Sequence, residues 1–131
     1  RAAAYAGRPL LLRSAPGAAG YAGCGWFLAI LAHARDSVPE ADIEGLLDCG
    51  DDAAVAIEAM RAGTERIAFH GSGRSRAIVE SIARALGATV EASPSEEPSQ
   101  RRAGDPSGAL DLRFAPDAYA ACRAFLRGHG L

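Results

Sequence analysis

One short loop combines the residue types that hold a phosphate or another anion, namely Gly71, Ser72, Gly73, Arg74 and Ser75. Glycines let backbone N–H groups approach a ligand closely, serine hydroxyls add donors, and arginine adds positive charge. A segment with helical periodicity follows, so the loop would lie at a helix N-terminus, where anions are favoured. The sequence therefore predicts an anion site here. The alternative is a serine-capped helix with exposed arginines.

Secondary candidates for ligand binding lie in the glycine-rich stretch near the N-terminus and at the ends of two later apolar runs. They are Ser14, Gly17, Gly20, Asp48, Cys49, Asp51 and His70. The carboxylates could hold a divalent cation or act as general acid and base. Asp51 or Asp52 could equally cap the helix that follows. Cys49 could be a nucleophile if His70 were within reach, or it could be an inert buried thiol. No metal site is predicted.

The spacing Gly17-x-x-Gly20-x-x-Gly23, with Asp48 further on, loosely imitates a dinucleotide fingerprint. The pattern is not G-x-G-x-x-G, and Pro16 lies at the turn. Small residues at these positions would also let a helix pack tightly on a sheet or on another subunit. We therefore predict no cofactor.

Composition excludes several classes of protein. The chain has 131 residues, enough for one domain spanning 1–131, and its net charge of -2 gives no basic footprint for nucleic acid. The longest apolar stretch, 21–34, is shorter than the roughly 20 residues of a membrane span. The three cysteines are odd in number and widely spaced, which indicates reduced thiols and a cytoplasmic protein.

Short apolar runs alternate with helical patterns along the chain. Strands are expected at 9–12, 42–47, 66–70 and 88–92, and helices at 21–37, 53–62, 76–86 and 116–127. Residues 93–109 are rich in Ser, Pro, Glu and Arg, which predicts a flexible polar loop, and 110–112 is a candidate fifth strand.

This alternation predicts an α/β fold. We expect a single three-layer domain of Rossmann-like or flavodoxin-like type, with a parallel sheet in βαβαβαβ order and a C-terminal helix. Ligands of such sheets bind outside the carboxyl ends of the strands, near the point where strand order reverses. The candidate residues all fall in loops at that edge.

Two resemblances add to these expectations. Pro9–Gly23 (PLLLRSAPGAAGYAG) and Leu46–Asp51 (LLDCGD) resemble a group of short bacterial α/β proteins, which implies a similar fold but no activity. Residues 67–90, with His70-Gly71-Ser72-Gly73-Arg74-Ser75, locally resemble the phosphate loop of sugar isomerase (SIS) domains. That second resemblance implies a sugar phosphate held by Ser72 and Ser75.

Two functions remain in view. The first is a small module that binds an anionic, phosphorylated metabolite at the strand-end loops. The second is a non-catalytic domain that forms a homo-oligomer, most simply a dimer, through the glycine-rich loop and the apolar first helix. That helix carries a second apolar stripe, Trp26 and Ile30, beside the one expected in the core. The sequence identifies no catalytic residue and favours binding over catalysis.

Overall fold

The computed structural model describes residues 7, 9–91, 110 and 115–128 of the chain. The polar loop predicted at 93–109 and most of the candidate fifth strand lie outside these residues. Strands and helices alternate in the order β1 (Leu10–Arg13), α2 (Ala18–Ala22), α3 (Cys24–Ser37), β2 (Ile43–Asp48), α4 (Ala53–Arg61), β3 (Arg66–Ala68), α5 (Gly73–Leu86), β4 (Thr89–Glu91) and α6 (Ala118–Gly128).

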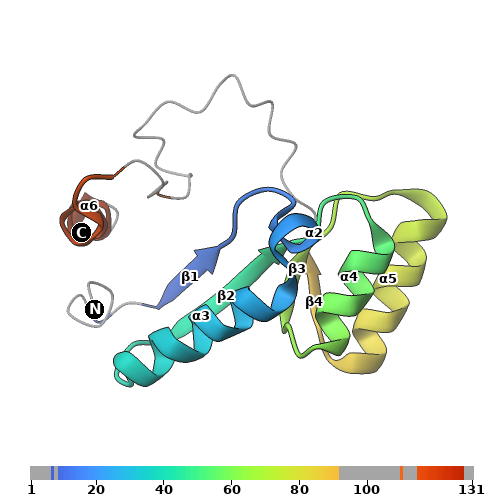
Figure 1. Ribbon diagram of the computed structural model, residues 1–131, viewed down its shortest axis with the longest axis horizontal. Helices are drawn as coiled ribbons and strands as arrows, with labels where there is room; N and C mark the ends of the chain where they lie inside the picture. Colours follow the sequence, from blue (N-terminus) through green and yellow to red (C-terminus); the bar gives the residue numbers. More distant parts are fainter. Residues whose placement is uncertain (1–6, 8, 92–109, 111–114, 129–131) are drawn as a thin grey trace.

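The four strands form one parallel sheet, which confirms the predicted α/β class (Figure 1). Their spatial order is β1-β2-β3-β4, the same as their order in the chain. Strand β2 is the longest and joins the two halves of the sheet. Its first residues pair with β1, from Ile43 opposite Leu10, and its last two pair with β3, ending at Asp48 opposite Ala68.

Sequential order means that the described strands contain no point where strand order reverses. A ligand site at such a reversal is therefore not possible within the described strands. The carboxyl edge of the sheet, where Arg13, Asp48 and Ala68 end their strands, remains as the expected place of a site.

The main cluster of buried apolar side chains lies on one face of the sheet. Side chains of alternate strand residues point to opposite faces, and the core cluster takes Ile43 and Leu47 from β2 and Ile67 from β3. The same cluster contains buried residues from α3, α4 and α5, including Phe27, Met60 and Val79. These three helices therefore form one layer, as parallel crossovers of the same hand require in a sheet of sequential order. A third layer is not seen among the described residues.

The predicted helix at 21–37 is two helices, which corrects the sequence prediction. Gly23 separates them with a φ of 78° and a ψ of 161°, a conformation that favours glycine. The short helix α2 lies within the stretch predicted to be a glycine loop, because Ala18 and Ala19 bury their methyl groups in the core. Helix α5 also begins earlier than predicted, at Gly73 rather than at residue 76.

The apolar residues of α3 divide between core and surface. Phe27 and Leu31 are buried, while Trp26 is 43% exposed and Ile30 is 51% exposed. The second apolar stripe noted in the sequence is therefore a surface feature of the chain. No helix in the described part of the chain has the length and apolar character needed to cross a membrane.

Candidate functional site

The carboxylate of Asp48 is the centre of the carboxyl edge of the sheet. Asp48 is the last residue of β2, and its side chain is 1% exposed. Its Oδ1 accepts hydrogen bonds from the backbone N–H groups of Gly17 at 2.9 Å and Gly50 at 3.0 Å. Its Oδ2 lies 3.4 Å from Nη2 of Arg13 and 3.2 Å from Nε2 of His70. One carboxylate thus joins the loops that follow β1, β2 and β3.

The backbone conformation of two glycines allows their N–H groups to point at the Asp48 carboxylate. Gly17 has a φ of 65° and Gly50 a φ of 61°, in the left-handed region that other residues rarely adopt. Ser14 completes the link, because its hydroxyl accepts the N–H of Asp48 at 2.8 Å and lies 3.2 Å from the carbonyl oxygen of Ala15, to which it donates. Of the sequence-predicted residues, Ser14, Gly17 and His70 therefore hydrogen-bond to the Asp48 carboxylate or its backbone.

The electrostatics favour an ionised Asp48. Burial alone would raise the pKa of this carboxyl group. The N–H groups of Gly17 and Gly50, and then the hydrogen bond and charge of His70, outweigh burial and hold the pKa of Asp48 below its usual range. The site therefore contains a buried anion whose charge is stabilised by directed donors.

His70 contacts the buried Asp48 carboxylate and is itself partly exposed to solvent. Its side chain is 37% exposed, and its backbone N–H donates to the carbonyl oxygen of Gly50 at 2.8 Å. With one ring nitrogen held by Asp48, the imidazole has a fixed orientation and an exposed edge. A histidine so placed can hold an anion or transfer a proton.

The loop from Gly71 to Ser75 continues directly from His70. Gly71 allows a tight turn over the buried ring of Phe69, since a Cβ at this position would lie 2.2 Å from Cζ of that ring. Ser72 is the N-cap residue of α5 in an extended conformation, but its own side chain makes no capping hydrogen bond to the helix. The hydroxyl of Ser75 donates to the carbonyl oxygen of Ser72 at 2.9 Å.

The two arginines of this region differ in their partners. Arg76 donates to Glu80 at 2.8 Å and to the carbonyl oxygen of Phe69 at 3.1 Å, so it holds the start of the helix. Arg74 is exposed in the first turn of α5. Within the described part of the chain, Arg74 is therefore the arginine of this helix terminus that has no hydrogen-bond or ion-pair partner.

The N-terminus of α4, which follows the loop after β2, differs from that of α5 because its N-cap side chain makes capping hydrogen bonds. The carboxylate of Asp52 accepts hydrogen bonds from the N–H groups of Ala54 at 2.8 Å and Val55 at 3.3 Å, which makes it the cap of α4. Its own side chain occupies the position that an external anion would take. Of the two capping candidates, Asp51 is exposed and Asp52 is the one used.

The remaining predicted residues do not assemble into a reactive group. Cys49 is buried, and desolvation, with the charge of Asp48 adding to it, raises the pKa of its thiol to about 12. Gly20 is exposed within α2, so the three spaced glycines do not form a single loop. Within the described ranges, no group of three or more His, Cys, Asp or Glu residues could hold a metal ion.

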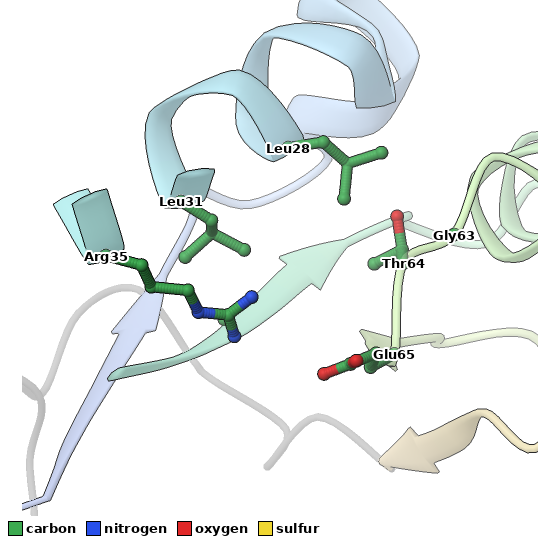
Figure 2. Close-up of a pocket in the computed structure, with 7 residues that line it drawn as sticks. Leu28, Leu31, Arg35, Gly63, Thr64 and Glu65 are labelled. Carbon is green, nitrogen blue, oxygen red and sulfur yellow. The ribbon is translucent and has the colours of Figure 1, made fainter. Parts of the chain in front are cut away.

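A small pocket lies away from this cluster, between α3 and the turn that enters β3 (Figure 2). Leu28, Leu31 and Arg35 form its helical side, and Thr64 and Glu65 face them. The Arg35 guanidinium donates to the carbonyl oxygen of Ile43 at 3.0 and 2.9 Å. This pocket is at the amino end of β3, opposite to the edge that carries Asp48 and His70.

Sequence reasoning missed Arg13 as a member of the site. Its guanidinium contacts the Asp48 carboxylate from the strand next to β2. The available signal was its position directly after the apolar run 9–12, since the carboxyl ends of parallel strands meet at one edge.

The fold and this cluster define an α/β protein with a sequential parallel sheet and, at its carboxyl edge, a buried carboxylate paired with a partly exposed histidine. Comparison of the chain with protein-family models, with curated proteins and with solved structures found no match.

Proposed function

We propose that this protein binds a small anionic ligand, a phosphorylated metabolite, at the loop from His70 to Ser75. One observation carries the proposal: α5 is a 14-residue helix whose N-cap residue, Ser72, makes no side-chain capping hydrogen bond. The first N–H groups of a helix have no intrahelical acceptor, and together with the helix dipole they favour an anion. At the corresponding end of α4, Asp52 already supplies that anion.

The neighbouring side chains support the same ligand. His70, oriented by Asp48, lies on one side of the helix terminus in sequence, and exposed Arg74 lies within its first turn. Arg74 can donate hydrogen bonds to phosphate oxygens, and His70 can do so through Nδ1 when its imidazole is protonated on both nitrogens. The proposal includes a cytoplasmic location, where phosphorylated metabolites are available, and the three free cysteines agree with it.

The test is thermal unfolding with inorganic phosphate, sugar phosphates and nucleotides. A ligand that binds only the folded state raises Tm in proportion to RT ln(1 + [L]/Kd). We expect a rise in Tm for the wild-type chain and a smaller rise, or none, for Arg74→Ala and Ser72→Ala. Arg84→Ala is the matched control, because Arg84 is exposed in the last turn of the same helix. An equal rise in Tm for Arg74→Ala and Arg84→Ala would refute the proposed site.

The second candidate function is self-association, and the exposed apolar face of α2 and α3 favours it. Tyr21 is 71% exposed, and Trp26 and Ile30 are also exposed on the surface. Aromatic side chains are enriched at the centre of protein interfaces. Light scattering of Trp26→Asp tests this function: we expect a smaller particle than for the wild-type chain. A folded variant with an unchanged mass would exclude this face as the interface.

A further inference from the structure

The imidazole of His70 has one ring nitrogen engaged and one available. Nε2 lies 3.2 Å from Oδ2 of Asp48, whose side chain is 1% exposed, while the side chain of His70 is 37% exposed. Within the part of the chain that the structure describes, the other ring nitrogen, Nδ1, has no hydrogen-bond partner. The ring is therefore anchored on its buried side.

This anchoring determines which nitrogen can act as a nucleophile. A carboxylate accepts a hydrogen bond and cannot donate one when ionised, so the proton of the neutral imidazole lies on Nε2 and the lone pair on Nδ1. The other oxygen of Asp48 is already engaged by Gly17 and Gly50, which fixes the orientation of the carboxylate. Histidine with a free lone pair forms covalent intermediates.

We propose that Nδ1 of His70 accepts a phosphoryl group from a small donor with a good leaving group, such as an acyl phosphate or a phosphoramidate. The Nδ1 lone pair forms the N–P bond while the bond from phosphorus to the leaving group breaks, and the leaving group departs with that electron pair. No oxidant or reductant is needed. The imidazole ring becomes positively charged, and the Asp48 carboxylate on Nε2–H stabilises that charge.

The residues after His70 can hold the phosphoryl group once it is attached to Nδ1. The last three residues of the loop, Gly73 to Ser75, are the first residues of α5, and the stretch contains no carboxylate, since it reads Gly-Ser-Gly-Arg-Ser. Arg74 supplies a positive charge within one helical turn of the N-terminus. This inference rests on the proposed function, because the same N–H groups and Arg74 would hold the phosphoryl oxygens.

The experiment treats the full chain with potassium phosphoramidate, in which ammonia is the leaving group, and follows intact mass and peptide maps. We expect one phosphoryl group, stable in alkali and lost in acid, at His70. The label should be absent in His70→Gln and unchanged in His33→Gln. His33 is the matched control, because it is exposed on α3 and, among the described residues, its ring has a hydrogen-bond contact with the exposed Ser37 and none with a carboxylate.

Two further variants test the environment of the ring. Arg74→Ala should lower the labelling rate about tenfold, the loss expected for one charge-assisted hydrogen bond in the transition state. Asp48→Asn should lower the rate as well, with Nδ1 and Nε2 no longer distinguished in the ¹⁵N imidazole spectrum. If Asp48→Asn does not fold, the spectrum of the wild-type chain decides, and it should show the proton on Nε2.

The outcomes separate this inference from the proposed function. Labelling of His33 as fast as His70, or no label at His70, would overturn the inference. If phosphate still raises Tm in that case, the anion site stands without the transfer. If phosphate does not raise Tm and His70 is unlabelled, both are overturned.

Discussion

The N–H of Gly17 donates to Oδ1 of Asp48 at 2.9 Å, across 31 residues of chain. This bond attaches the stretch that follows β1 to the end of β2, and Ser14 adds a second link through the N–H of Asp48 at 2.8 Å. The glycine-rich stretch thus folds onto a carboxylate of its own chain. The N–H of Gly17 therefore serves a contact within the fold.

Asp48 should make stability depend on pH in the acidic range. Its folded pKa is below the value in an unfolded chain, so its contribution to the free energy of unfolding is present above the unfolded pKa and lost as pH falls through the folded pKa. We expect Asp48→Asn to lose about 3 kcal/mol at neutral pH and to show a shallower acid dependence. Urea unfolding at several pH values measures both. Asp36→Asn, at an exposed position, is the control; equal pH profiles for the two variants would contradict the prediction.

Gly71→Ala should destabilise the fold by about 1–3 kcal/mol, because the new methyl group would overlap the Phe69 ring, which is fully buried and cannot move aside easily. Gly20→Ala is the control, since nothing lies within 4 Å of a Cβ there and the residue is helical. We expect Gly20→Ala to be stabilising by about 0.5–1 kcal/mol. Denaturant unfolding compares the two. Similar stabilities would mean that the turn at Gly71 relaxes without cost.

The two helix N-termini should respond differently to loss of their N-cap side chains. Asp52→Ala removes two hydrogen bonds to the start of α4 and should cost about 1 kcal/mol. Ser72→Ala removes no capping hydrogen bond and should change stability by less than about 0.5 kcal/mol. Thermal unfolding without added anions measures both values. A larger loss for Ser72→Ala than for Asp52→Ala would show that Ser72 caps α5 after all.

Cys49 should resist alkylation in the folded protein. Burial and the adjacent Asp48 charge raise the pKa of its thiol to about 12, so the reactive thiolate is scarce near neutral pH. Cys24 is only half-buried. Iodoacetamide followed by peptide mass mapping should label Cys24 first and Cys49 only after denaturant is added. Equal rates in native protein would contradict the burial of Cys49.

The sequence determined the element order of this protein. Short apolar runs and helical apolar patterns, with Gly87 and Asp52 at helix ends, were sufficient to predict a four-stranded parallel α/β sheet, because these signals are local. The break at Gly23 was missed, since whether a glycine ends a helix or lies within it depends on what its neighbours bury. Ala18 and Ala19 enter the core and extend helical structure into the glycine-rich stretch.

The candidate site depended on tertiary structure. The sequence placed Asp48 and His70 in separate loops, and only the parallel pairing of β2 with β3 brought Nε2 of His70 to 3.2 Å from Oδ2 of Asp48. It also could not decide which helix N-terminus was capped, because Asp52 and Ser72 are both good N-cap residues. The direction of each side chain decided that question, with Asp52 turned onto its own helix and Ser72 making no cap. Residue type specifies what a group can donate or accept, while long-range pairing of the backbone fixes which partner it meets.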